Sequence, residues 1–335
     1  MVETLIPGLV DDVAELCLSR VPRSSFRIIC QVCWGWRRFL WSERYGAVRK
    51  LTGSVEELMC VLMDHQYWEV FDGSGNKLGG IPPIPGPLKR DSRLAMLDGG
   101  KIVVIGAIYY KGRSEMKALP YVYEFNPCTN RKLADMNIPR YGFEYAVVDG
   151  LLYVIRGLTS YGDYLFNLEV YNPKTNKWSL MDFPYRPTSY CAFAFSFKSK
   201  LFVAGENYYK SSFIYIYDPK TETWEEFDSG YSIKAYSYTV IRNKVCFFDC
   251  YNYRGMVVFD PEKNSWSFVF LPQFSDHESG FRFILGKLNN KVFLVSQDGE
   301  GICSDDFDKE DAVEWKASPI KLPAYTFISS VLINF

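Results

Sequence analysis

The sequence predicts a mainly β fold: a six-bladed β-propeller preceded by a small N-terminal module of three helices. Three observations support this fold class. Apolar residues recur at helical spacing within residues 1–50. A turn-and-strand unit then repeats every 42–46 residues, which is the period of propeller blades. Aromatic residues make up 17% of the chain, including 24 Tyr and 25 Phe, and aromatic side chains favour strands.

The charge balance and the cysteines limit the possible partners and compartments. The 335 residues include 38 basic and 39 acidic side chains, which gives no general reason to expect nucleic acid or an anionic membrane as a partner. Residues 1–10 contain Glu3 and Pro7 and lack the long apolar core of a signal peptide. No run approaches the ~18 apolar residues of a membrane span. With nine scattered cysteines, we expect a cytoplasmic or nuclear protein whose thiols are free.

A first helix is expected to begin near Asp12. Its carboxylate is predicted to cap the first turn, with Glu15 three residues later as in a capping box. The spacing of the following apolar residues puts them on one helix face. These residues are Leu9, Val13, Leu16, Cys17 and Val21.

Two more helices are expected after Pro22, because the residue before a proline avoids helical geometry. The second restarts at Ser24 or Ser25, and its apolar residues are Phe26, Ile29, Cys30 and Cys33. The third contains Trp34, Trp36, Phe39, Leu40 and Trp41. These apolar residues exceed what so small a core would bury, which predicts a hydrophobic docking face. The alternative is that the helices pack against the propeller.

The N-terminal helices resemble an F-box over residues 5–45. The family pattern is Leu-Pro-Asp-Asp/Glu, an apolar helix, a Val/Leu-Pro pair and then Val-Cys-x-x-Trp-Arg. This chain has residues 9–13, Val21-Pro22 and residues 32–38 at the matching positions, with Val10 where the family has proline. The resemblance implies binding to a Skp-type adaptor through Pro7, Leu9, Val10, Val13, Cys17, Leu18, Pro22, Val32, Cys33 and Trp36.

The repeat is marked by an Asn-Pro or Asp-Pro pair that follows an apolar strand. The Asn or Asp residues are Asn126, Asn172, Asp218 and Asp260. The short side chain can accept local backbone hydrogen bonds while proline fixes φ, so each pair predicts a tight turn. In three repeats a tryptophan stands six residues later, on the next strand, where it can pack against the neighbouring blade.

Each repeat is expected to form a four-stranded antiparallel meander with its first strand nearest the propeller axis. Hairpin signals such as Asp149-Gly150 join the two strands that precede each Asn/Asp-Pro turn. Five blades are predicted at 88–139, 140–187, 188–229, 230–272 and 273–320. Residues 58–63, 68–72 and 325–335 would form a sixth, closed by the C-terminal strand, although five or seven blades are also possible. The expected domains are 1–50 and 54–335.

The repeated region resembles the kelch repeats of plant F-box/kelch proteins over about residues 54–335. The double glycine typical of the second kelch strand is reduced here to the single glycines Gly106, Gly157 and Gly205. The resemblance implies a kelch-type propeller.

Catalytic and metal-binding patterns are not apparent in the sequence. The two histidines, His65 and His277, fall in different blades. One Cys-x-x-Cys pair, Cys30 and Cys33, supplies two of the roughly four ligands that a zinc site needs. We therefore expect no cofactor, no metal and no catalytic residues.

The loops between the second and third strands of the blades are long and aromatic, and they emerge on one face of the propeller. Tyr and Arg are enriched at protein-binding hot spots, and variable loops on a rigid scaffold commonly carry recognition. A protein substrate is therefore expected to contact Tyr109, Tyr110, Arg113, Tyr161, Tyr164, Tyr208, Tyr209, Tyr251, Tyr253 and Arg254. The alternative is that these tyrosines cover blade edges.

The two resemblances together imply a substrate-recognition subunit of an SCF-type, cullin-RING ubiquitin ligase. The module would bind the adaptor, and through it a cullin, while the propeller binds a protein destined for ubiquitination and degradation. A propeller scaffold uncoupled from a ligase is the alternative that Val10 suggests. A third hypothesis is an enzyme with a pocket on the propeller axis, but the sequence shows no set of acid/base or metal-binding residues that would support it.

Overall fold

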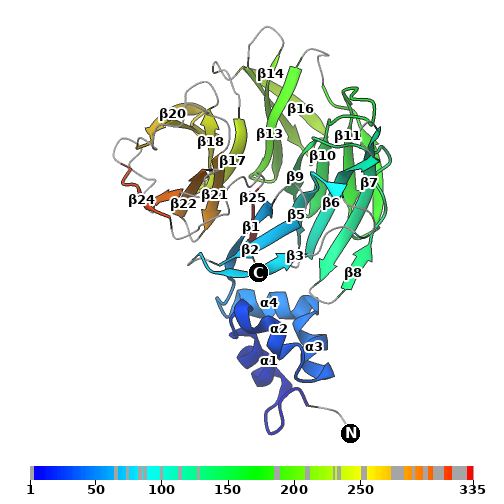
Figure 1. The fold of residues 1–335 in the computed structure, drawn as a ribbon, viewed down its shortest axis with the longest axis vertical. Helices are drawn as coiled ribbons and strands as arrows, with labels where there is room; N and C mark the ends of the chain where they lie inside the picture. The colour runs from blue at the N-terminus through cyan, green and yellow to red at the C-terminus, as the bar shows by residue number, and fades with distance from the viewer. Residues whose placement is uncertain are drawn as a thin grey trace.

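A computed structural model shows a ring of β-sheets with a group of helices projecting from its rim (Figure 1). It describes residues 4–63, 67–72, 75–81, 85, 89–98, 101–111, 115–126, 129–184, 189–207, 212–228, 231, 235–249, 255–272, 283–288, 291–296, 301–304, 313–318 and 330–334. Among these residues, no helix is long and apolar enough to cross a membrane.

The helical module contains α1 (Asp11–Ser19), a 3₁₀ turn (Arg23–Ser25), α2 (Phe26–Ile29) and α3 (Trp34–Leu40). A further helix, α4 (Glu43–Leu51), follows them and leads to the first strand. The module has its own small apolar core, formed by Leu18, Phe26, Cys30, Phe39, Leu40 and Tyr45. Tyr45 packs its ring edge-on against Phe39, with centroids 5.5 Å apart, so α4 is part of this core.

The start of α1 differs from the predicted capping box. The helix begins at Asp11, its N-cap is Val10, and no side chain caps it. Asp12 and Glu15 instead accept hydrogen bonds from the Arg44 guanidinium of α4, at 2.9 and 2.6 Å. The prediction was wrong because the helix begins before Asp12, which puts its carboxylate within the first turn, where it pairs with a cation from a neighbouring helix.

Arg49 of α4 joins the module to the propeller. Its side chain is almost fully buried and donates to the Val21 carbonyl at 3.0 Å and to the Ser54 carbonyl. It also forms a 3.0 Å ion pair with Glu56, the residue immediately before β1 (Glu57–Met63). One side chain thus connects the end of α1, the end of α4 and the start of the propeller.

The propeller has six sheets, which confirms the predicted blade count. The first contains β25 (Ser330–Asn334), β1, β2 (Tyr67–Phe71) and β3 (Lys77–Ile81). The second contains β4 (Lys89–Arg90), β5 (Arg93–Leu97), β6 (Lys101–Lys111), β7 (Glu115–Asn126) and β8 (Thr129–Lys132). The third contains β9 (Glu144–Val148), β10 (Leu151–Ile155), β11 (Leu168–Asn172) and β12 (Lys177–Met181).

The other three sheets repeat the four-stranded meander. The fourth contains β13 (Ser189–Phe197), β14 (Lys200–Asn207), β15 (Ser212–Asp218) and β16 (Thr223–Asp228). The fifth contains β17 (Ala235–Ile241), β18 (Lys244–Asp249), β19 (Gly255–Asp260) and β20 (Ser265–Phe270). The sixth contains β21 (Phe283–Leu288), β22 (Lys291–Ser296), β23 (Gly301–Ser304) and β24 (Lys316–Ala317). Neighbouring sheets contact one another through inner strands, as β9 contacts β13 and β17 contacts β21.

The C-terminal strand pairs with the first strand of the propeller. β25 runs antiparallel to β1, with Leu332 opposite Met59 and Val331 opposite Cys60. This pairing covers the inner edge of β1, and an open edge there would present unpaired backbone groups for pairing with other chains.

The Asn/Asp-Pro turns form as the sequence predicted in the three repeats whose turn side chains are described. Asn172 Oδ1 accepts from the Lys174 amide and Asp218 Oδ1 from the Lys220 amide, both at 2.9 Å. Asp260 Oδ1 accepts from the Glu262 amide at 3.0 Å. Each turn leads directly into the fourth strand of its blade, so local chemistry sets the strand order.

The tryptophans after these turns pack between blades, as predicted. The Trp178 indole donates to the Ala134 carbonyl of the preceding blade at 2.9 Å. Trp224 packs edge-on against Phe183, with centroids 5.1 Å apart. Trp315 in the sixth sheet follows no Asn/Asp-Pro pair, and its indole makes a similar contact by donating to the Phe270 carbonyl at 3.2 Å. These contacts fix each outer strand against its neighbour.

Candidate functional site

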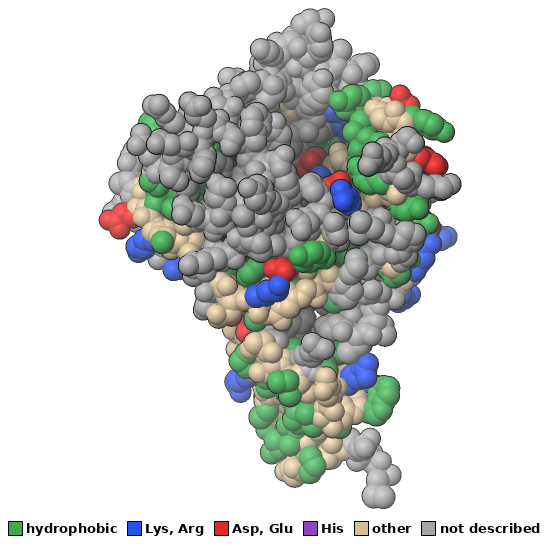
Figure 2. All heavy atoms as spheres, in the orientation of Figure 1, with side chains coloured by type: hydrophobic (Ala, Val, Ile, Leu, Met, Phe, Trp, Pro, Cys, Tyr) green, Lys and Arg blue, Asp and Glu red, His purple; other side chains and the backbone are tan. Residues whose placement is uncertain are grey.

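The helical module presents apolar side chains to solvent on the face of α1 that the spacing predicted. Ala14 and Leu18 point into the module core, whereas Leu9, Val10, Val13 and Leu16 are exposed, Val10 by 69%. Hydrophobic side chains cover much of the module in Figure 2. Val32 and Trp34, which precede and begin α3, are exposed by 58% and 80%. These six exposed residues, which we call the docking face, remain outside the core.

Eight of the ten predicted adaptor-binding residues are at the surface: Pro7, Leu9, Val10, Val13, Cys17, Pro22, Val32 and Cys33. The other two support the module. Leu18 is buried in its core. Trp36 is half-buried, and its indole donates to the Leu5 carbonyl at 2.5 Å, which holds the N-terminal segment against α3.

The two cysteines of the Cys-x-x-Cys pair make separate structural contacts. Cys33 Sγ accepts from the Trp36 amide at 3.4 Å and caps α3. Cys30 Sγ accepts from the Trp41 indole at 3.2 Å. In the part of the chain that the structure describes, no group of three or more His, Cys, Asp and Glu side chains could hold a metal ion.

Four of the ten predicted substrate-face residues can be placed. Tyr110 at the end of β6 and Tyr161 and Tyr164 after β10 are exposed, Tyr161 by 92%. Tyr109 is half-buried and packs against the apolar core between the first two blades. Arg113, Tyr208, Tyr209, Tyr251, Tyr253 and Arg254 lie outside the described residues.

The loop after β10 is held in shape by its own backbone. Leu158 exchanges two hydrogen bonds with Tyr141, at 2.8 and 3.1 Å, and the Leu165 amide donates to the Gly157 carbonyl at 2.9 Å. Gly157 has a φ of +103°, and a Cβ there would stand 2.9 Å from the Tyr141 carbonyl oxygen. Only glycine fits such a position without displacing the backbone, so the loop geometry depends on this kelch glycine.

A buried ion pair lies beneath the same loop. Arg140 donates to the Glu169 carboxylate at 2.5 Å, to the Arg156 carbonyl at 2.7 Å and to the Asn167 side chain at 3.0 Å. Both charged side chains are fully buried. Burial lowers the pKa of Arg140, and Glu169 partly offsets this effect. The guanidinium therefore fixes both ends of the loop segment 156–167.

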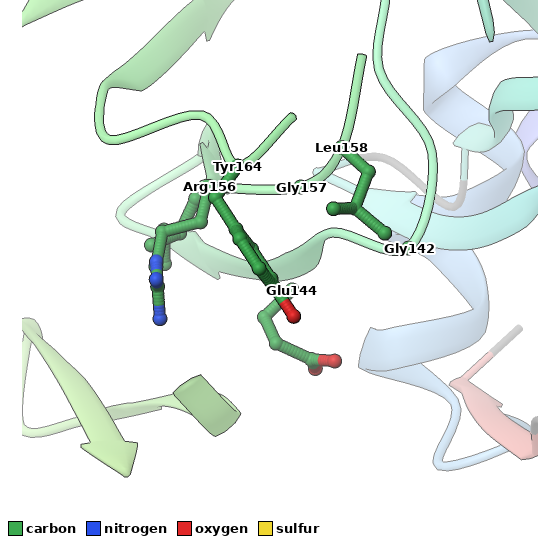
Figure 3. Close-up of a pocket in the computed structure, with 7 residues that line it drawn as sticks. Gly142, Glu144, Arg156, Gly157, Leu158 and Tyr164 are labelled. Carbon is green, nitrogen blue, oxygen red and sulfur yellow. The ribbon is translucent and has the colours of Figure 1, made fainter. Parts of the chain in front are cut away.

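A cavity of about 80 Å³ opens between this loop and β9. It is lined by Gly142, Glu144, Ile155, Arg156, Gly157, Leu158 and Tyr164 (Figure 3). Burial raises the pKa of Glu144 to about 7, and Arg93 of β5 partly opposes this shift. Glu144 is half-buried, because the surface it keeps borders the cavity. We call this cavity the Glu144 pocket.

Cations stack on the aromatic rings around the pocket. The Arg156 guanidinium lies 5.9 Å from the Tyr164 ring centroid and 6.0 Å from that of Phe166. On the neighbouring blade, Arg90 lies 5.9 Å from the Tyr110 ring centroid. These pairs place arginine beside tyrosine in this region, and Arg156 and Arg90 are not among the arginines that the sequence predicted for the substrate face.

The sequence analysis missed Glu144, Arg156 and Arg93. Glu144 and Arg93 each begin the strand next to the axis in their blades. A charged residue at the start of an inner strand can be noticed in the sequence and could have identified both. Arg156 adopts a φ of +59°, which is uncommon for a residue other than glycine. Its sequence context gives no sign of that conformation.

Comparison with known proteins places both modules in one family. The kelch motif model matches residues 139–181, the third blade. F-box/kelch-repeat protein At1g27420 of Arabidopsis thaliana is 54% identical over 99% of this chain and 97% of its own length. F-box/kelch-repeat protein At1g67480, also from Arabidopsis thaliana, is 35% identical over 96% of this chain and 88% of its own.

A solved structure shares the fold. The structure of YjhT superposes with a TM-score of 0.57 at 14% identity, covering 78% of this chain and 94% of that one. The two near full-length relatives carry the assignment: the chain belongs to the F-box/kelch-repeat family.

Proposed function

We propose that this chain is the substrate-recognition subunit of an SCF-type ubiquitin ligase. The F-box module binds a Skp-type adaptor, and the propeller binds a protein target for ubiquitination and degradation. The single observation that carries the proposal is the docking face. Val10, the N-cap residue of α1, and Val13 of α1 are exposed in a module that has a separate apolar core. A partner surface would bury them.

In this function the chain supplies proximity and no covalent chemistry. Holding adaptor and target on one chain converts their encounter into an intramolecular one, which raises the effective concentration of the target near the ubiquitin-charged enzyme. Action in the cytoplasm or nucleus is part of the proposal. Cys17, Cys33 and Cys60 are free thiols, and a reducing compartment maintains thiols in that state.

Val10 keeps the backbone geometry of the family proline that it replaces. Its φ is −71°, within the range of about −65 ± 15° that a proline ring imposes. The substitution therefore leaves the entry into α1 in the shape that proline would give it. This favours a ligase-coupled chain over the alternative, a propeller scaffold without a ligase.

The proposal is tested by target abundance in cells that express the wild-type chain or Val13→Asp. The charge disrupts the docking face, while the exposed position tolerates it in the folded module. Proteins that bind both forms equally but fall in abundance only with wild type are the expected targets. Leu180→Asp, at an exposed residue of β12, is the matched control and should behave as wild type. Equal abundance of every bound protein with wild type and Val13→Asp would favour the scaffold function.

A further inference from the structure

The Glu144 pocket has the size and location of a subsite for one side chain of a bound protein. Its volume of about 80 Å³ is several times the ~10–15 Å³ that one water molecule needs. Tyr164, which lines it, is exposed on the predicted recognition face. The surrounding loop is fixed by backbone hydrogen bonds such as that from Leu158 to Tyr141, so the pocket is formed before any ligand arrives. Preorganisation of this kind lowers the cost of binding.

The pocket contains a carboxyl group without a direct partner. Among the described residues, the Glu144 carboxyl makes no hydrogen bond and no ion pair within 4.0 Å. Arg93 is the one charged group that acts on it electrostatically, and the Arg93 Nε donates to the Phe143 carbonyl at 3.3 Å. An ionised carboxylate held away from water without a partner is costly. A ligand cation would remove this cost.

The other lining groups suit a long basic side chain. Leu158 is apolar and can contact the methylene stem of a lysine or arginine, while Ile155 is fully buried behind the pocket wall. In Figure 3 the Tyr164 ring lies between Arg156 on one side and Leu158 on the other, with Glu144 near its hydroxyl end. The Arg156 guanidinium thus faces the ring from outside, and a ligand cation could contact the opposite ring face.

We propose that the Glu144 pocket receives a lysine or arginine side chain of the target protein, with the Glu144 carboxylate as its counter-ion. This inference rests on the proposed function, because it names the chemistry by which the propeller recognises its target. An acidic target side chain is the competing ligand. It would meet Glu144 as a like charge and would require that carboxyl to stay protonated.

The groups packed around Glu144 leave it as the one that changes charge near neutral pH. Arg93 on β5 and Arg156, which lines the pocket, are cations. Tyr145, beside Glu144 on β9, donates its hydroxyl to the Leu94 carbonyl, and Tyr238 of β17 donates to the Ala194 carbonyl. Burial raises the pKa of both tyrosines, so both stay neutral. A cationic ligand should therefore bind more tightly once Glu144 is ionised.

The test is selection of a random peptide library on the full-length protein. Lysine or arginine should be enriched at one position in peptides selected by wild type, and Glu144→Gln should abolish that enrichment. The change is nearly isosteric, so the propeller is expected to stay folded. Glu225→Gln, the same chemical change at an exposed residue of β16, should retain the enrichment. No basic enrichment, or equal enrichment in Glu144→Gln, would overturn the proposal.

The pH dependence of a selected peptide separates the two ligand charges. Because the pKa of Glu144 is about 7, the affinity of a basic peptide should rise about tenfold from pH 6 to pH 8 in wild type and stay flat in Glu144→Gln. Affinity that falls over this range would identify an acidic ligand and refute the inference. Adaptor binding by the same preparation distinguishes this inference from the proposed function. A chain that binds the adaptor but selects no basic peptides would refute the Glu144 pocket as a basic subsite and leave the proposed function intact.

Discussion

Two glutamates in the third blade show how a side chain's partners decide its role. Glu169 accepts hydrogen bonds from Arg140 and from the amides of Asn137 and Ile138, at 2.5, 2.7 and 3.0 Å. Its carboxylate is thus fully engaged in holding the blade together. Glu144 borders a cavity instead, and none of the residues that the structure describes donates a hydrogen bond to its carboxyl. The first is therefore structural, and the second is available to a ligand.

Glu144→Gln should stabilise the protein at high pH. The pKa of Glu144 rises from an ordinary 4.5 to about 7 on folding. Between these values the native state binds more protons than the unfolded state, so the free energy of unfolding falls as pH rises. At 1.36 kcal/mol per pKa unit, the cost of ionisation reaches about 3 kcal/mol at pH 8 and stays below about 1 kcal/mol at pH 5.

Urea unfolding of wild type and Glu144→Gln at pH 5 and pH 8 measures this difference. The variant should gain stability mainly at pH 8. Glu225→Gln, at an exposed site, should change little at either pH. A gain of equal size at both values would show that Glu144 is not held near its neutral form.

At the residue scale, local chemistry could be predicted and long-range chemistry could not. Asn172, Asp218 and Asp260 bond amides two residues away, so their roles follow from sequence alone. Glu144 depends on Arg93, which lies some fifty residues earlier and on another blade. No spacing in the sequence indicates that these two groups approach one another.

At the level of single elements, helix spacing predicted the apolar face of α1, and tertiary packing decided how it is used. The face with Leu9, Val13 and Leu16 is exposed, while Leu18 turns inward toward α3 and α4. Asp12 does not cap the helix, because α1 already begins at Asp11, and its carboxylate pairs with Arg44 of α4 instead. Neither outcome can be read from the residues of α1 alone.

Arg49→Ala should loosen the helical module while leaving the propeller folded. It removes the donors that serve Val21, Tyr45 and Ser54. A hydrogen bond from a charged group is worth about 1.5–3 kcal/mol. Bonds from one side chain do not add independently, so the module should lose on the order of 3 kcal/mol. Amide exchange in α1 to α4 should then accelerate about a hundredfold.

Hydrogen exchange with mass spectrometry resolves this effect by segment. Lys50→Ala, the neighbouring exposed residue of α4, is the matched control and should exchange like wild type. Unchanged exchange in Arg49→Ala would mean that the small core around Phe39 holds the module without the Arg49 contacts. Equal acceleration in module and propeller would instead mean that they unfold as one unit.

For the whole molecule, the blade period could be predicted because each turn and tryptophan repeats. The six sheets and their order follow that period. The placement of the helical module does not follow from the blade period, because it depends on the contacts of Arg49 at the junction. Figure 1 shows the helices at the rim near β3, away from the third-blade strands β9 to β11. An adaptor on the docking face would therefore leave the loop face of that blade open to a target.

The most direct test of this account is calorimetric titration of the purified full-length chain with a Skp-type adaptor. The account predicts a one-to-one complex that weakens at least tenfold in Val10→Asp and in Val13→Asp, where a charge would enter a buried apolar interface. Val10→Pro, which the backbone φ of −71° accommodates, should bind at least as well as wild type, as should the propeller control Leu180→Asp. A folded chain that binds no adaptor, or binds it equally well in both aspartate variants, would contradict the assignment of the docking face.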